Sequence, residues 1–245
     1  MKMTGNTILI TGGSTGIGLS LADRFLKAGN RVLICGRRKD RLEEAEKAHP
    51  GLRTFVCDVS KQADREALFA YAVREFPGIN VLFNNAGVMR FMRLEGSQAW
   101  DVPAEEIATN LTAPIHLSML FAGHLAGQRD AVILNTTSGL SHVPLASAPV
   151  YSATKAALHS FTQSLRRQLA EKGIKVVEVC PPHVNTDLGV PGANGAGMDL
   201  QAYIDSVMAG LEKGDEEITV GFSAIASRAG REEKERMFAQ LNGMR

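Results

Sequence analysis

Short apolar runs alternate with longer amphipathic stretches along this chain. The runs are rich in Val, Ile and Leu without strict alternation, which is typical of parallel strands covered on both faces. They lie at Thr7–Ile10, Arg31–Cys35, Thr54–Cys57, Val81–Phe83, Ala131–Leu134 and Lys175–Val179, with a further candidate at Ile218–Val220. The stretches between them predict helices at Ile17–Ala28, Asp40–Ala48, Gln62–Glu75, Pro103–Phe121 and Ser152–Glu171.

Local capping residues support several of these helix boundaries. Gly29 and Gly173 each follow a predicted helix, where a C-terminal glycine is common. Pro103 with the acidic Glu105 and Glu106 suits a helix start. The alternation of strands and helices predicts an α/β protein with a doubly wound parallel sheet. Because no repeat and no linker-like shift in composition interrupts the pattern, we expect residues 1–245 to form a single domain.

Composition and charge exclude several classes of protein. The chain is 44% apolar and 22% charged, as in an ordinary globular protein, and 27 basic against 26 acidic residues leave no field for nucleic acid or anionic lipid. No uninterrupted apolar stretch is long enough to predict a membrane span. The three cysteines, Cys35, Cys57 and Cys180, lack metal-ligand spacing, so no metal site is predicted and all three are expected to be buried. Their odd number and the lack of an evident leader favour a reducing, cytoplasmic location.

A glycine-rich segment, Thr11–Gly18, follows the first predicted strand and opens the first predicted helix. Glycines there permit a tight turn and a close approach of a diphosphate to backbone N–H groups at the helix N-terminus. A turn without a ligand is the alternative, but the position after the first strand favours nucleotide binding. The residues expected to contact the nucleotide are Gly12, Ser14, Thr15, Gly16, Ile17 and Gly18.

The end of the second predicted strand bears on the choice of nucleotide. An acidic residue at this position binds a ribose 2′-hydroxyl, whereas an arginine accommodates a 2′-phosphate. The chain has Arg37 and Arg38 there and no acid. We therefore expect NADP(H) to be favoured over NAD(H), with a solvated basic turn as the alternative interpretation.

Tyr151 and Lys155 are spaced so that both lie on one face of a helix, with Cβ atoms about 5–6 Å apart. A free tyrosine has a pKa of about 10, and a nearby positive charge lowers it. Such a pair can exchange a proton with an alcohol or a carbonyl. Most pairs at this spacing lie on a solvated helix face, so the pair gains weight only from the other motifs.

These motifs occur in the order found in the classical short-chain dehydrogenase/reductase family, which the chain resembles over nearly its whole length. Thr11–Gly18 is similar to the TGxxxGIG loop, Asn84–Gly87 to the NNAG motif and Tyr151–Lys155 to YxxxK. Asn110 falls at the helix asparagine, and Ser138 lies thirteen residues before Tyr151. The resemblance implies a Rossmann-like fold and a small-molecule carbonyl or alcohol substrate.

The same resemblance implies roles for the catalytic residues. Tyr151 would be the general acid in carbonyl reduction and the base in the reverse reaction. Lys155 would lower the pKa of Tyr151 and hold the nicotinamide ribose. Ser138 would hydrogen-bond the carbonyl oxygen, and Asn110 would kink its helix and hold a water in a proton relay.

Further cofactor contacts follow from the resemblance. Asp58 would contact the adenine amino group with Val59 beside it, and Asn85, Ala86 and Gly87 would line the ribose side. Pro181, Val184 and Thr186 fit contacts at the nicotinamide. The chain departs from the family at Pro182, where Gly is frequent, because proline fixes φ and has no N–H donor. His183 is a less favoured second base.

Assembly is a further implication of the resemblance, which predicts a homo-oligomer, either a tetramer or a dimer. The helices carrying Asn110 and Tyr151 have more apolar positions than one core-facing stripe needs. These positions are Leu111, Ile115, Leu117, Leu158, Phe161 and Leu165.

The segment Thr186–Leu200 contains four glycines and a proline, which is unfavourable for long regular structure. It is expected to be a lid over the active site, and a passive surface loop is the alternative.

The whole pattern predicts an NADP(H)-dependent oxidoreductase that interconverts a ketone or aldehyde with an alcohol. A catalytically silent dinucleotide-binding sensor or scaffold is the competing hypothesis, which the intact Asn110, Ser138, Tyr151 and Lys155 set disfavours.

Overall fold

The computed structural model describes residues 1–95, 99–189 and 197–243. Within this part of the chain, seven parallel strands form one sheet in the order β3-β2-β1-β4-β5-β6-β7, which confirms the doubly wound fold. Between β3 and β4 the chain crosses back to the other side of β1, so the strand order reverses there. Ligands bind at such a switch point, beyond the carboxyl ends of the strands. The strands are β1 Thr7–Thr11, β2 Arg31–Gly36, β3 Arg53–Val56, β4 Val81–Asn84, β5 Val132–Thr136, β6 Lys175–Cys180 and β7 Glu217–Thr219.

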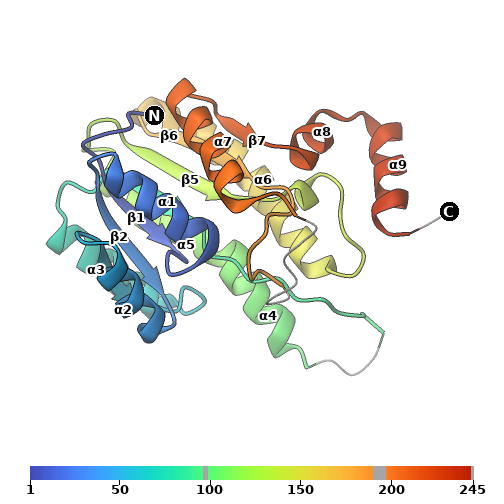
Figure 1. Ribbon diagram of the computed structural model, residues 1–245, viewed down its shortest axis with the longest axis horizontal. Coiled ribbons are helices and arrows are strands. Elements are labelled where there is room, and N and C mark those ends of the chain that lie inside the picture. Colours follow the sequence, from blue (N-terminus) through green and yellow to red (C-terminus); the bar gives the residue numbers. More distant parts are fainter. Residues whose placement is uncertain (96–98, 190–196, 244–245) are drawn as a thin grey trace.

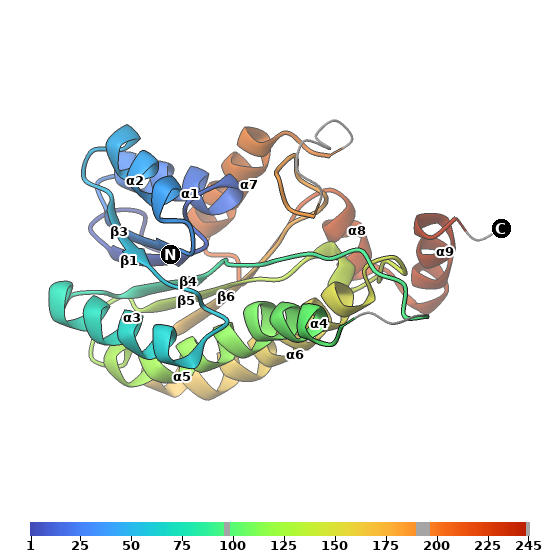
Figure 2. The same ribbon diagram turned by 90° about the horizontal axis from the view of Figure 1, so that it is seen from below.

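Helices cover both faces of the sheet (Figure 2). One face carries α1, α2 and α7, and the other carries α3, α5 and α6. Ile8 and Ile10 pack under the first group, whereas Leu9 packs under the second. Positions on both faces of the central strands are therefore mostly apolar. The helices are α1 Gly16–Lys27, α2 Lys39–Ala48, α3 Gln62–Glu75, α4 Asp101–Ile107, α5 Ala113–Leu125, α6 Pro149–Leu169, α7 Leu200–Lys213, α8 Phe222–Arg228 and α9 Arg231–Leu241.

The structure corrects the predicted helix 103–121. A π-helical segment, Ala108–Thr112, separates α4 from α5, so the chain makes two helices joined by a bulge. Such bulges insert one extra residue into the helical ladder and are frequent at functional sites. Asn110 lies within the bulge.

The C-terminal part of the chain contains helices that the hydrophobic pattern did not predict. α7 has buried positions on one face, including Tyr203 and Val207. α9 stands beyond α8 at the edge of the molecule and has no buried residue (Figure 1), so its sequence carries little apolar signal.

Two predictions from composition can be compared with the described residues. All three cysteines are buried and free, as expected. Among the described helices, none combines the length and the apolar character that crossing a membrane requires.

Candidate active site

A cleft of about 680 Å³ lies at the carboxyl ends of the central strands. It is lined by the glycine-rich loop after β1, the ends of β2 and β4, the start of α6 and the segment after β6. All of the predicted cofactor residues except Val184 line this one cleft. They are Gly12, Ser14, Thr15, Gly16, Ile17, Gly18, Arg37, Arg38, Asp58, Val59, Asn85, Ala86, Gly87, Tyr151, Lys155, Pro181 and Thr186.

The glycine-rich loop requires glycine for both conformation and space. Gly12 has φ +64°, and a Cβ there would lie 2.7 Å from the Cα of Ala86. A Cβ on Gly18 would lie 2.5 Å from the backbone oxygen of Gly12. The loop can therefore pack closely against the end of β4. It delivers the N-terminus of α1 to the cleft, where no acidic side chain occupies the first helical turn. This arrangement favours an anion.

Thr11 joins the glycine-rich loop to the segment after β4. Its hydroxyl oxygen accepts hydrogen bonds from the backbone N–H groups of Asn85 and Ala86, both at 3.0 Å. The Asn85 side-chain amide donates to the backbone oxygen of Thr11, also at 3.0 Å. These contacts hold one wall of the cleft in place.

Three arginines lie where the cleft meets the end of β2. Arg37 and Arg38 were predicted, and Arg41 joins them from the first turn of α2. The Arg37 guanidinium donates to the Glu105 carboxylate at 2.6 Å, and Arg90 lies 3.8 Å from the same carboxylate. No acid follows β2 in the sequence, but α4 brings Glu105 to Arg37 from 68 residues away.

Asp58 and Val59 form the cleft wall after β3. The Asp58 carboxylate accepts hydrogen bonds from the backbone N–H and the hydroxyl of Ser60, at 3.1 and 2.7 Å. The backbone N–H of Asp58 donates to Asp64 at 2.8 Å. This local network fixes the direction in which Asp58 faces the cleft.

Tyr151 and Lys155 lie on the first turns of α6, and both are buried. The Lys155 ammonium donates to the backbone oxygen of Thr136 at 2.7 Å and lies 5.5 Å from the centre of the Tyr151 ring. Burial lowers the pKa of Lys155 to about 8, because the charged form loses its hydration. The lysine is therefore anchored to β5 beside the tyrosine.

The pKa of Tyr151 moves in the direction opposite to the prediction. Burial raises it, and this effect outweighs the opposing hydrogen bond with Ser138. The negative Glu106 nearby raises it further. In this structure the Tyr151 phenol therefore keeps its proton at neutral pH.

Ser138 and Asn110 border the site without lining the cleft. Ser138 follows β5, and its hydroxyl oxygen accepts from the backbone N–H of Leu140 at 3.2 Å. The Asn110 side chain accepts from the Val88 N–H at 2.9 Å and donates to the Val88 oxygen at 2.8 Å. It also donates to the Thr154 hydroxyl at 3.3 Å, so it links the segment after β4 to α6.

Glu106 is a residue of the site that sequence reasoning treated only as a helix-start signal. It is fully buried, and one carboxylate oxygen accepts from the Arg90 N–H at 3.0 Å. The other oxygen has no hydrogen-bond partner within the described part of the chain. Burial raises the pKa of Glu106, and its charge in turn raises the pKa of both Lys155 and Tyr151. The signal in the sequence that could have identified Glu106 is an acidic residue at a helix position where the neighbouring pattern favours an apolar one.

The segment after β6 reaches the cleft only in part. Pro181 and Thr186 line it, together with Asp187, Leu188 and Gly189. Val184 is buried and pairs with Met198, which closes the base of the loop. Of the predicted lid 186–200, residues 190–196 lie outside the described residues, and Leu200 already belongs to α7.

Comparisons with known proteins agree with this geometry. The chain matches the short chain dehydrogenase family over residues 6–194. It is 45% identical to DltE, an uncharacterised oxidoreductase of Bacillus subtilis (strain 168), across 99% of this chain and 98% of that protein. This chain therefore belongs to the short-chain dehydrogenase family, whose members are oxidoreductases that use NAD(P) to act on CH–OH groups.

Solved structures give the same result. A short chain dehydrogenase from Burkholderia cenocepacia J2315 in complex with NADP has a TM-score of 0.85 at 25% identity, covering 98% of this chain and 99% of its own. A short-chain dehydrogenase from Sphingobium yanoikuyae in complex with NADPH has a TM-score of 0.79 at 26% identity, with 87% of each chain covered. This chain thus shares its fold with short-chain dehydrogenases that bind NADP and NADPH.

Proposed function

We propose that this chain is an NADP(H)-dependent oxidoreductase that interconverts a ketone or aldehyde with an alcohol, with Tyr151 as general acid and base. One observation carries the proposal. The buried Tyr151 and Lys155 pair lies on the same cleft as the glycine-rich loop and the three arginines. A proton donor and a helix N-terminus suited to an anion thus line the same cleft, which is large enough for a ligand.

The residues of the cleft fit a nicotinamide dinucleotide. The N-terminus of α1 suits the diphosphate. Lys155 and the Thr136 hydroxyl, which has no hydrogen-bond partner among the described residues, offer polar groups at the far end. When bound, the nicotinamide supplies or accepts the hydride, and the protein supplies orientation and the proton.

Tyr151 is suited to donate a proton in the reductive direction. Its raised pKa keeps the phenol protonated at neutral pH, as a general acid requires. We propose that Ser138 orients the carbonyl oxygen toward this phenol and that Asn110 fixes the wall beside it through Val88. Because Lys155 has a pKa of about 8, it is largely cationic at neutral pH and favours negative charge developing on the oxygen.

The preference for NADP(H) rests on Arg37, Arg38 and Arg41. Guanidinium groups form strong charge-assisted hydrogen bonds with phosphate oxygens, and three line the cleft at the end of β2. The solved relatives in complex with NADP and NADPH support the same choice.

The substrate is proposed to be of medium size and partly apolar. Phe91 is 50% exposed and Leu188 is 45% exposed, each on a segment next to the cleft. The Phe91 ring lies 3.3 Å from where a Gly189 Cβ would stand, so the two segments meet beside the site.

The test replaces Tyr151 with phenylalanine. After a panel of ketones, aldehydes and alcohols has identified a substrate, Tyr151→Phe should lower turnover about 10²–10⁴-fold, the usual worth of general acid–base catalysis. NADPH binding should change little. Tyr71→Phe makes the same chemical change on α3, where Tyr71 stacks on Phe55, and should leave turnover intact. Wild-type turnover in Tyr151→Phe contradicts the role, and tight NADPH binding without turnover on any substrate favours the silent sensor.

We also propose that the chain forms a homo-oligomer through α5 and α6. Of the apolar positions noted there, Leu117, Leu158 and Leu165 are buried in the chain's own core and do not support an interface. Met119 on α5 does, because it is 68% exposed. Light scattering at micromolar concentration should give a dimer or tetramer mass. Met119→Lys should lower it and Val56→Lys, on exposed β3, should not. A monomeric wild type refutes the proposal.

A further inference from the structure

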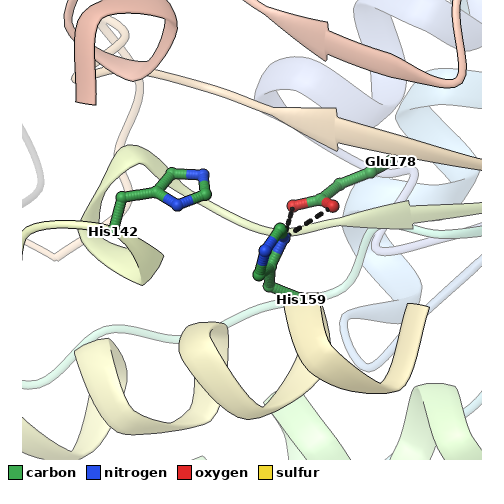
Figure 3. A group of neighbouring side chains, drawn as sticks. All are labelled: His142, His159 and Glu178. Atoms are coloured by element: carbon green, nitrogen blue, oxygen red, sulfur yellow. Dashed lines mark hydrogen bonds and ion pairs between the residues drawn. The ribbon is translucent and has the colours of Figure 1, made fainter. Parts of the chain in front are cut away.

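A cluster of two histidines and a glutamate lies on the side of the sheet covered by α6, away from the dinucleotide cleft. His142 follows a short 3₁₀ turn after β5, His159 is on α6, and Glu178 is on β6 (Figure 3). One potential ligand atom from each residue lies within 4.8 Å of the other two. The topology thus brings three segments together at one point.

Glu178 and His159 form the tight half of this cluster. Both carboxylate oxygens contact the His159 Nδ1 atom, at 2.9 and 2.8 Å, and the Thr137 hydroxyl donates to the carboxylate at 2.6 Å. Glu178 is only 1% exposed. Burial raises its pKa, but the hydrogen bonds from His159 and Thr137 outweigh burial and leave the pKa lowered. A buried carboxylate is therefore held ionised.

His142 is the loose half. Its ring centre lies 4.8 Å from that of His159, and neither of its ring nitrogens forms a hydrogen bond within the described residues. Burial lowers its pKa, and the neighbouring His159 lowers it further. The imidazole therefore stays neutral, with a nitrogen lone pair available next to an ionised carboxylate.

We propose that His142, His159 and Glu178 bind a divalent transition metal, with Zn²⁺ as the expected ion. Two imidazole nitrogens and one carboxylate oxygen are a known zinc donor set that leaves one position open. Tetrahedral bonds of about 2.0–2.2 Å place ligand atoms roughly 3.3 Å apart. The Glu178–His159 contact therefore opens slightly on binding, and the His142 ring moves inward.

Access and support for the ion are both present. His142 lines a surface groove of about 490 Å³ between the loop after β5 and α9, which gives a path for the ion and for a water as fourth ligand. The other ring nitrogen of His159 lies 3.2 Å from the Gln163 side-chain amide. After an amide flip, Gln163 accepts the Nε2–H. The metal then displaces the proton that Nδ1 shares with Glu178, and Nδ1 becomes the ligand atom.

Both negative and positive side chains lie around the proposed metal site. Glu178 and Glu217 favour a cation, whereas Lys234 and Arg166 oppose it. Glu178 touches the site directly and is buried, whereas Lys234 belongs to α9 at the groove, so the carboxylate dominates at the ion's position.

The site joins the three segments that carry the catalytic groups without containing any of them. His142 is four residues after Ser138, His159 is one helical turn beyond Lys155, and Glu178 precedes the Pro181 segment. Metal binding would hold these segments in register. The inference does not depend on the proposed function.

The test is metal binding by the tag-free, full-length chain. Competition with a chromophoric zinc chelator should give one equivalent of Zn²⁺, and Co²⁺ should give the visible absorption of a tetrahedral site. His142→Ala and Glu178→Gln should each weaken zinc binding at least about tenfold, since even outer-shell losses cost 10–100-fold. His49→Ala is the matched control, because His49 also contacts a carboxylate, that of Asp23 at 3.0 Å, but this carboxylate is paired with Lys27 and no second histidine joins it among the described residues. This variant should bind zinc as the wild type does.

Each other outcome overturns the proposal. One such outcome is that the wild type binds no zinc at micromolar concentration. The other is that His142→Ala binds zinc as tightly as the wild type. Melting curves establish that each variant is folded. If Glu178→Gln fails to fold, the half-buried His142 still decides, because its removal leaves the buried Glu178–His159 contact in place.

Discussion

Replacing Arg37 with alanine should separate the affinities for NADPH and NADH. Arg37 lines the cleft at the end of β2, where the fold places a nucleotide's ribose, and it is half-exposed. A charge-assisted hydrogen bond to a 2′-phosphate is worth ~1.5–3 kcal/mol. Its loss should therefore weaken NADPH binding roughly 10- to 150-fold. NADH lacks the 2′-phosphate, so its affinity should change little.

Glu105 modifies this expectation, because Arg37 is already paired with it at 2.6 Å. With side-chain exposures of 49% and 34%, such a pair is worth ~0–1 kcal/mol. A 2′-phosphate can therefore take Arg37 from Glu105. Glu105→Gln removes both the competing pair and a nearby negative charge. It should raise NADPH affinity by up to about fivefold and leave NADH affinity nearly unchanged.

The assay is fluorescence titration of both dinucleotides into the wild type and both variants, at one ionic strength. The double variant Arg37→Ala/Glu105→Gln completes the cycle, and the gain from Glu105→Gln should be smaller in it, because much of that gain acts through Arg37. Equal binding of NADPH and NADH by the wild type would refute the reasoning. So would an Arg37→Ala variant that loses affinity for both dinucleotides alike.

Two further predictions concern Lys155 and the loop after β6. The folded pKa of Lys155 is about 8 against an ordinary 10.5, so between these values the unfolded chain binds more protons and stability rises with pH. From about pH 7 to 9.5, the free energy of unfolding of the wild type in urea should therefore rise by ~2 kcal/mol more than that of Lys155→Met. Parallel pH profiles of the two proteins would contradict this. NADPH should slow hydrogen exchange at the amides of Asp187–Gly189, because these residues line the cleft. The Met198 amide, which is hydrogen-bonded to the His183 backbone oxygen at 2.8 Å, should exchange slowly with and without NADPH. Unchanged exchange at Asp187–Gly189 would show that these residues form a passive surface loop.

The sheet and most of the cleft could be predicted from the sequence because their signals are local. Each strand is an apolar run, and the glycine-rich loop follows β1 directly in the chain. The doubly wound topology then brings every strand end to the same edge. Residues that were predicted from separate sequence motifs consequently lie around one cleft.

What escaped prediction depends on contacts between distant parts of the chain. Glu105 meets Arg37 across 68 positions, and no local pattern links them. The pKa of Tyr151 depends on how deeply α6 buries the phenol, which the spacing to Lys155 does not reveal. The His142, His159 and Glu178 cluster likewise spans three elements, so none of its members has a sequence neighbour that marks it.

A buried polar seam between the sheet and its α5–α6 layer explains how the site keeps its geometry. Asn84 donates to Asn135 at 2.9 Å across β4 and β5, and Asn135 donates to Thr162 on α6 at 3.0 Å. Lys155 on α6 adds a hydrogen bond to the backbone oxygen of Thr136, the next residue of β5 after Asn135.

Burying these groups without partners would cost more than any one of the bonds gains. A shift of α6 by one helical turn would break both bonds between the sheet and this helix, from Asn135 to Thr162 and from Lys155 to Thr136, whereas apolar packing alone tolerates sliding. The buried polar groups therefore fix the position of α6 along its own axis relative to the sheet, and with it the position of Tyr151 at the cleft.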